Sequence, residues 1–362
     1  MLTIDKRPFS FGEMIGQKGI LSEMKKRSLS KNFPEVMIFE GDSGTGKTTL
    51  AFIISALINE KNPLDRGDYL DPDPNSKSSK SILNETFNRD VHFFDASVMG
   101  KDDVISLEEI VGSSPMFDEN KVIIIDEAQE LSKAGKGVTL KLLEKKRKNV
   151  HIILCTMNIN AFDKAVKTRG QLYTFRNPSS SDIAEYLFNL LKYVDSDNIP
   201  DEFLETGIFT IAENCEGSVR YAVQNLERCI TGELFTEEEI SKELGFLSNE
   251  RLTSLIMDIL NKEKSCIPKI IDFSCKDFFY KANKTILEAV IFKNTGYVSS
   301  DWKRSFSEKI QKYEDLEKLA EIFIDINSQA YFKEDLFLFK LSQFMKQEKS
   351  APVVKIRERV KK

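Results

Sequence analysis

The feature that most constrains this chain is a glycine-rich turn between an apolar run typical of a strand and one typical of a helix. Residues 41–48 read GDSGTGKT and fit the pattern GxxxxGK[ST] at every position. VMIFE precedes them, and TTLAFIISALI follows. Glycines let a backbone wrap closely around phosphate oxygens, and the start of the following helix turns its positive dipole end toward them. The turn therefore predicts a phosphate-binding site.

Two side chains of this turn are expected to carry the chemistry. Lys47 should reach the β- and γ-phosphates, and the Thr48 hydroxyl should ligate Mg²⁺. ATP and Mg²⁺ are therefore the expected cofactors. The other contacts are expected from the rest of the turn and the residue after it: Gly41, Asp42, Ser43, Gly44, Thr45, Gly46 and Thr49.

The run VIIIDE, residues 122–127, is the second chemical signal. A near-continuous β-branched run is typical of a strand buried on both faces in a parallel sheet. Asp126 at its end is expected to hold Mg²⁺, directly or through water, and Glu127 to polarise the attacking water as a general base. The alternative is an acidic pair that merely ends a strand, and the phosphate-binding turn upstream makes it less favoured.

Strand-like and helix-like runs alternate through the first half of the chain. The predicted strands are VMIFE, VHFFDAS, VIIIDE, HIILCTMN and QLYTFRN, with helical patterns such as DDVISLEEIV between them. This alternation predicts a doubly wound parallel sheet, an α/β fold. The polar, turn-rich run from Asn62 to Lys80 is predicted to be an exposed loop or insertion.

From Pro178 onward the strand-like runs end and amphipathic helices follow. Helices are predicted over 183–194, 202–213, 217–230, 250–262 and 280–294, and GELFTEEEISKELGF breaks the pattern. A chain of 362 residues suggests two or three domains. We therefore expect domains at 1–177, 178–240 and 249–350, followed by a frayed basic tail at 351–362.

Composition excludes several classes of protein. The 52 basic and 57 acidic side chains give a net charge of −5, so any nucleic-acid surface must be local. Neither a membrane-spanning run nor a secretion signal is apparent, so we expect a cytoplasmic protein, or one in the host cytoplasm if a phage encodes it. The five cysteines are odd in number and widely spaced, which favours buried free thiols over disulfides or a zinc site.

Several segments besides these motifs resemble one known family. They are RPFSFGEMIGQ, KVIIIDEAQELSKAGKGVTLKLLE, TRG at 168–170 and GSVRYAVQNLE. Over residues 5–235 the chain is similar to AAA+ ATPases of the clamp-loader class, such as bacterial DNA polymerase III gamma/tau subunits and phage loader large subunits. The resemblance implies a parallel-sheet P-loop AAA+ domain, a small helical lid domain and an all-helical, collar-like oligomerisation domain.

The resemblance also implies further site residues. Arg169 matches the arginine finger that enters the ATP site of an adjacent subunit, and Arg220 matches the sensor-2 arginine that acts in cis. The ungapped register puts Met157 at the polar sensor-1 position; we favour Asn158, and Thr156 stays open. The N-terminal segment implies an adenine pocket, with candidate contacts at Arg7, Pro8, Ile15 and Gln17.

The implied function is that of an ATP-driven motor subunit of a sliding-clamp loader, acting on primer–template DNA in a ring of loader subunits, a pentamer by resemblance. The helices after VIIIDE line the DNA chamber in this class, so Lys133, Lys136 and Lys141 are candidate DNA contacts; Lys145, Lys146, Arg147 and Lys148 extend the basic block. Met116 and Phe117 could anchor the clamp, although we favour their packing on the chain's own core. The family's zinc module is missing.

Two alternative functions stay open. One is another AAA+ motor on nucleic acid, such as a branch-migration helicase or a helicase loader. The other is a scaffold subunit that does not hydrolyse ATP. Intact Lys47, Thr48, Asp126 and Glu127 argue against the scaffold.

Overall fold

The computed structural model describes residues 7–84, 88, 90–144, 148–193, 199–298, 301–329 and 331–346. The chain divides into two compact units, Met1–Thr236 and Glu237–Lys362. The expected tail at 351–362 and the basic residues at 145–147 lie outside the described residues.

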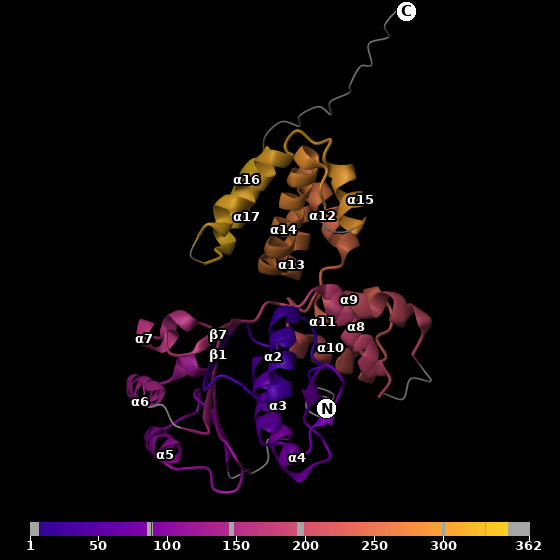
Figure 1. The fold of residues 1–362 in the computed structure, drawn as a ribbon. Helices are drawn as coiled ribbons and strands as arrows, with labels where there is room; N and C mark the ends of the chain where they lie inside the picture. Colours follow the sequence, from indigo (N-terminus) through magenta and orange to yellow (C-terminus); the bar gives the residue numbers. More distant parts are fainter. Residues whose placement is uncertain are drawn as a thin grey trace, which may run out of the picture. The chain divides into compact units, whose positions relative to one another are not determined.

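A five-stranded parallel sheet forms the centre of the first unit (Figure 1). Its strand order is β4-β5-β6-β1-β7. All five predicted strands are confirmed, and so is the doubly wound α/β fold. The strands are β1 (Val36–Glu40), β4 (Val91–Asp95), β5 (Lys121–Asp126), β6 (Val150–Thr156) and β7 (Gln171–Thr174).

Helices cover both faces of this sheet (Figure 1). Successive strand residues point to opposite faces, and in β1 Phe39 packs in the cluster with the α3 residues while Ile38 packs in the other cluster. Burial on both sides explains the continuous β-branched runs. One face carries α2 (Lys18–Ser30) and α3 (Lys47–Asn59), and the other carries α5 (Lys101–Gly112), α6 (Lys133–Glu144) and α7 (Lys164–Lys167).

The run from Asn62 to Lys80, predicted as an exposed loop or insertion, is not a loop. It contains the antiparallel hairpin of β2 (Leu64–Asp65) and β3 (Leu70–Asp71) and the start of α4 (Lys77–Leu83). The segment is therefore a folded part of the first unit.

Hydrogen bonds between polar groups explain why this segment folds despite its composition. Asp71 is buried, and its carboxylate accepts hydrogen bonds from the Phe11 N–H at 2.9 Å and from Arg66 Nε at 3.1 Å. The Glu60 carboxylate accepts one from Ser79 Oγ at 2.6 Å. Buried polar groups that satisfy one another cost little, so a polar sequence here does not mean an exposed one.

The rest of the first unit is a small helical layer. It consists of α8 (Ser180–Leu191), a π-helical turn (Phe203–Gly207) that continues as α9 (Ile208–Glu213), and α10 (Val219–Thr231). The three helices predicted in this region are confirmed. We call α8 to α10 the lid helices.

The described part of the second unit is helical throughout. Phe279 lies at its centre, with its ring stacked on Phe323 at 5.2 Å between centroids and edge-on to Phe337. The aromatic-rich runs thus pack within the chain, and α11 occupies the segment where the sequence pattern breaks. The helices are α11 (Glu237–Leu244), α12 (Asn249–Leu260), α13 (Cys266–Phe273), α14 (Cys275–Thr295), α15 (Asp301–Ile310), α16 (Leu316–Asn327) and α17 (Glu334–Lys346).

All five cysteines are buried and free, as the sequence predicted. Burial raises the pKa of Cys229 to about 12, which keeps that thiol protonated at neutral pH. Within the described ranges, no helix has the length and apolar character needed to cross a membrane.

Candidate nucleotide-binding site

The glycine-rich turn connects β1 to α3, and two of its glycines are required by both conformation and space. Gly44 and Gly46 have positive φ angles of 79° and 97°, a region that favours glycine. A Cβ on Gly44 would lie 2.3 Å from Ser218 Oγ, and one on Gly46 would lie 2.9 Å from Met14 Cε. The turn is therefore closely surrounded by the lid helices and the N-terminal segment.

Lys47 is the first residue of α3, and its side chain folds back onto the glycine-rich turn. Its side chain is buried, and Nζ donates hydrogen bonds to the carbonyl oxygens of Gly41 and Asp42, each at 2.8 Å. Burial lowers the pKa of Lys47, while the charges of the nearby Glu127 and Asp126 oppose that shift. The ammonium group therefore lies where a phosphate bound in this turn would need a positive charge.

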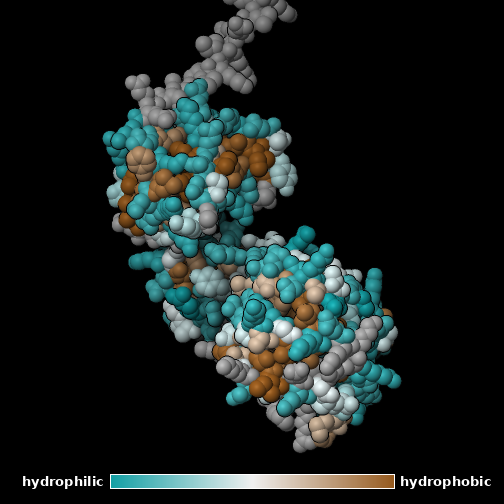
Figure 2. All heavy atoms as spheres, turned by 90° about the vertical axis from the view of Figure 1, so that its left-hand side faces the viewer, coloured by the Kyte–Doolittle hydropathy of each residue, from teal (hydrophilic) through white to brown (hydrophobic). Residues whose placement is uncertain are grey.

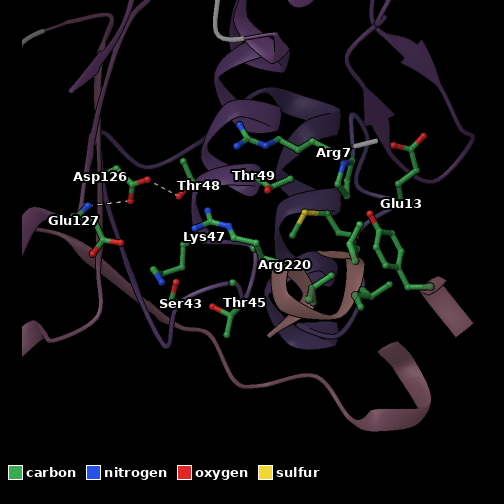
Figure 3. A pocket seen from close by; sticks show the side chains of 18 residues that line it. Arg7, Glu13, Ser43, Thr45, Lys47, Thr48, Thr49, Asp126, Glu127 and Arg220 are labelled. Atoms are coloured by element: carbon green, nitrogen blue, oxygen red, sulfur yellow. Dashed lines mark hydrogen bonds between the residues drawn. The ribbon is translucent and has the colours of Figure 1, made fainter. Parts of the chain in front are cut away.

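Thr48 and Asp126 meet beside the turn (Figure 3). Thr48 Oγ1 donates a hydrogen bond to Asp126 Oδ2 at 2.7 Å, and the Glu127 N–H donates to Asp126 Oδ1 at 2.9 Å. Burial raises the pKa of Asp126, and these two hydrogen bonds counteract the rise. A hydroxyl and a carboxylate are oxygen ligands of the kind that Mg²⁺ prefers, so this pair fits a magnesium site.

Glu127 follows the end of β5 and lines the same cavity. Its backbone has a positive φ of 45°, which is uncommon for a residue with a side chain. Its Oε2 accepts a hydrogen bond from Gln129 Nε2 at 2.6 Å. Sequence reasoning identified Glu127 but missed Gln129, because no motif marks that position.

The cavity is formed by the turn, the N-terminal segment and the lid helices (Figure 3). Of the predicted nucleotide contacts, residues 43–49 line it, and so do Arg7, Pro8 and Ile15. Gly41 and Asp42 do not line it. Gln17 does not line it; its Nε2 instead donates a hydrogen bond to the Arg176 carbonyl at 2.6 Å. The lining residues that sequence reasoning did not single out are Glu13, Met14, Tyr186, Val219 and Val223.

Arg220 lies in the first turn of α10 and extends into the cavity (Figure 3). The helix is capped by Ser218, whose hydroxyl accepts a hydrogen bond from the Tyr221 N–H at 3.3 Å. The Val219 N–H donates to the Gly44 carbonyl at 3.2 Å. The start of α10 is thus hydrogen-bonded directly to the glycine-rich turn.

The three sensor-1 candidates lie at the end of β6 and differ in their contacts. Thr156 is fully buried, and its Oγ1 donates a hydrogen bond to Gln129 Oε1 at 2.9 Å. Met157 is half-exposed. Asn158 uses its side-chain oxygen to accept from the Asn160 N–H at 2.9 Å, which caps the next short helix. The hydrogen-bonded chain to Glu127 therefore runs through Thr156, not through the side chain of the favoured Asn158.

Arg169 does not line the cavity of its own chain. It follows α7, where one guanidinium nitrogen pairs with Glu144 at 3.0 Å and another donates to the Ala165 carbonyl at 2.7 Å. Its action on a neighbouring subunit stays a prediction.

The candidate DNA contacts on α6 do not share one environment. Lys133 and Lys141 are exposed and lie eight residues apart, which places them on one helix face with the exposed Gly137. Lys136 is half-buried, with Nζ 5.7 Å from the centre of the Phe162 ring. Lys133 and Lys141 are therefore the more accessible pair.

The packing that we favoured for Met116 and Phe117 is wrong. Their exposed fractions are 74% and 57%. The buried Asp90 carboxylate accepts hydrogen bonds from the N–H groups of Met116, Phe117 and Asp118 at 2.8, 2.6 and 2.9 Å. These bonds fix the loop with both apolar side chains outward, and Figure 2 shows apolar surface on the side of the first unit that carries α5 to α7.

Sequence comparisons show which known proteins this chain is similar to. The family "DNA polymerase III, delta subunit" matches residues 16–179. The DNA polymerase III subunit gamma of Buchnera aphidicola is 28% identical over 71% of this chain and 68% of its own length. The tau subunit of Bacillus subtilis is 27% identical over 72% of this chain, and the gamma/tau subunit of Mycoplasma genitalium is 31% identical over 61%.

These relatives differ in how much of them the chain spans. It covers 45% of the Bacillus subtilis protein and 36% of the Mycoplasma genitalium protein. The resemblance drawn from the motifs is nevertheless confirmed: the chain is similar to AAA+ ATPases of the clamp-loader class.

Proposed function

We propose that this chain is an ATP-driven motor subunit of a sliding-clamp loader, which opens a processivity clamp and places it on primer–template DNA. The observation that carries the proposal is the cavity in which Lys47, Thr48, Asp126, Glu127 and Arg220 meet. Relatives named as gamma and tau subunits of DNA polymerase III support the loader role.

In this proposal, each residue of the cavity has its own role in ATP hydrolysis. The turn and Lys47 would hold the phosphates, and Thr48 with Asp126 would hold Mg²⁺, whose chemistry when bound would be to neutralise phosphate charge. Glu127 takes a proton from the attacking water as general base. Arg220 adds positive charge in cis from the lid helices.

Arg169 is proposed to act on the ATP site of an adjacent subunit. A guanidinium suits this role because its planar fork presents several donors to phosphoryl oxygens at once. Each site then depends on assembly, so hydrolysis should be slow in the isolated chain. Clamp and primed DNA, which favour the assembled ring, should stimulate it.

The exposed surfaces of the first unit supply the partner contacts in this proposal. Met116 and Phe117 are proposed to dock into an apolar pocket of the clamp, since buried aromatic and methionine side chains commonly anchor interfaces. Lys133 and Lys141 are proposed to contact DNA phosphates, which would make binding salt-sensitive and independent of sequence.

The test is ATP turnover by the assembled loader with and without clamp and primed DNA. Lys47→Ala and Glu127→Gln are each expected to reduce stimulated turnover by about 100-fold or more, because each removes a group that acts on the reacting phosphate or water. Lys264→Ala and Glu130→Gln, at exposed positions outside the cavity, serve as matched controls.

Clamp loading by assemblies that carry Lys47→Ala, at the normal rate, would contradict the proposal. Strand displacement without any clamp requirement would instead favour the branch-migration or helicase-loader alternative. Absence of turnover in complete assemblies would favour the scaffold.

A further inference from the structure

Gln129 joins the proposed general base to the end of strand β6. Its Nε2 donates a hydrogen bond to Glu127 Oε2 at 2.6 Å. Its Oε1 accepts two hydrogen bonds, from Thr156 Oγ1 at 2.9 Å and from the Met157 N–H at 3.1 Å. One amide side chain thus connects the residue after β5 to the last residue of β6.

These contacts determine which way the Gln129 amide faces. The Met157 N–H can only donate, so the group beside it must be the amide oxygen. The Thr156 hydroxyl accepts from the Asn158 N–H at 3.1 Å and has one proton, which it donates to the same amide oxygen. The amide nitrogen is left facing Glu127, where it can donate to a carboxylate.

Glu127 needs such an anchor because its side chain is long. A glutamate side chain has many rotamers, and holding it in one costs conformational entropy. The backbone is already fixed, since the Glu127 carbonyl accepts from the Glu130 N–H at 2.8 Å in the short helix that begins there. Gln129 lies within this turn and restrains the carboxylate itself.

We infer that Gln129 is a positioning residue, which holds the Glu127 carboxylate at the edge of the phosphate site and couples it to the β6 end. The inference rests on the proposed function, because it concerns the same site. The stretch that begins at Thr156 is also tied to β1, since the Ile159 N–H donates to Glu40 Oε1 at 3.0 Å. The stretch continues through α7 to Arg169, so the hydrogen bonds of Gln129 link Glu127 to the segment that ends at the proposed arginine finger.

The first experiment changes Gln129 in the complete assembly with clamp and primed DNA. Gln129→Leu removes both hydrogen-bonding ends, and Gln129→Glu keeps the shape and the acceptor for Thr156 but replaces the donor beside Glu127 with a carboxylate. Both variants should lower kcat by about 10- to 100-fold, since a misplaced reacting group has an effect of this size. Affinity for a nonhydrolysable ATP analogue and the Tm should match the parent chain.

Gln224→Leu is the matched control, because Gln224 is exposed and does not line the cavity. Unchanged kcat in Gln129→Leu, or faster turnover, would overturn the inference. Equal losses of kcat and analogue affinity would also overturn it, because they would indicate general damage to the site.

A double-mutant cycle identifies the partner through which Gln129 acts. Single-turnover hydrolysis is measured for Glu127→Gln with and without Gln129→Leu. If Gln129 acts through Glu127, the second change adds no further loss. Additive losses would overturn the inference. An inactive parent assembly would refute the proposed function instead, which separates the two failures.

Discussion

Asp90 shows how one buried carboxylate determines the position of a surface loop. Its two oxygens accept hydrogen bonds from three consecutive N–H groups at the loop that presents Met116 and Phe117. Burial alone would raise the pKa of Asp90, but the three N–H donors and the charge of Lys121 outweigh it, and the pKa lies below its ordinary value. The ionised form therefore stabilises the fold.

Asp90→Asn is expected to lower the free energy of unfolding by about 1–3 kcal/mol at pH 7, because charge-assisted hydrogen bonds are lost. The contribution of the carboxylate is present above its ordinary pKa of 3.8 and is lost as the pH falls through the lower folded-state value. Chemical denaturation from pH 7 to pH 2 should show the parent and variant converging in acid. Asp201→Asn, at an exposed position, is the control, and a constant difference at every pH would contradict this account.

Single residues were predictable from the sequence where a local spacing fixes their chemistry. Lys47, Thr48 and Asp126 meet as expected, because a GxxxxGK[ST] turn and a buried strand end impose their positions. Gln129 was not predictable, since its partner Thr156 lies 27 positions away in the sequence, at the end of β6. We favoured Asn158 over Thr156 because the sequence does not reveal the contact between Thr156 and Gln129.

At the scale of elements, the position of each lysine on helix α6 determines how exposed its side chain is. Thr139 and Leu142 face the core, while Lys133 and Lys141 share an exposed face. A helix of this kind can lie along a phosphate backbone without disturbing its packing. The half-buried Lys136, beside the Phe162 ring, is less available.

Replacing both Lys133 and Lys141 with alanine should weaken binding of primed DNA by the assembly. The dependence of log K on log salt should become shallower by about 2, because each phosphate contact contributes about 0.9. Fluorescence anisotropy across a salt series measures this slope. Lys264→Ala is the control, and a slope identical to that of the parent chain would exclude these lysines from the DNA contact.

Helices and strands were predictable from the sequence where apolar side chains alone account for their burial. The five strands could be read because both faces are apolar, as in the Ile123-Ile124-Ile125 run of β5. The hairpin of β2 and β3 could not, because one of the groups that stabilise Asp71, the Phe11 N–H, lies 60 positions away in the sequence. Composition alone cannot show that a polar group has found a buried partner.

At the scale of the whole molecule, the two units have separate cores. Buried clusters around the sheet belong to the first unit, and a cluster that includes Phe279, Phe323 and Phe337 belongs to the second. The second also holds a buried ion pair, Lys262 with Asp315 at 3.1 Å. Domains with their own cores can fold alone.

Residues 237–362 expressed alone are therefore expected to be helical and to unfold in one cooperative thermal transition. Residues 1–236 alone should still bind an ATP analogue, because every residue that lines the cavity lies between Arg7 and Val223. Circular dichroism and analogue titration measure the two outcomes. Gradual melting of the fragment 237–362, or failure of the fragment 1–236 to bind the analogue, would show that the units depend on each other.

The close approach of Gly44 to Ser218 limits how this sequence can drift over generations. Any side chain at position 44 would collide with the hydroxyl that caps α10. Shrinking residue 218 to relieve the collision would remove that cap. Neither position is therefore free to vary singly, and natural variants should preserve the two residues together or exchange them as a pair.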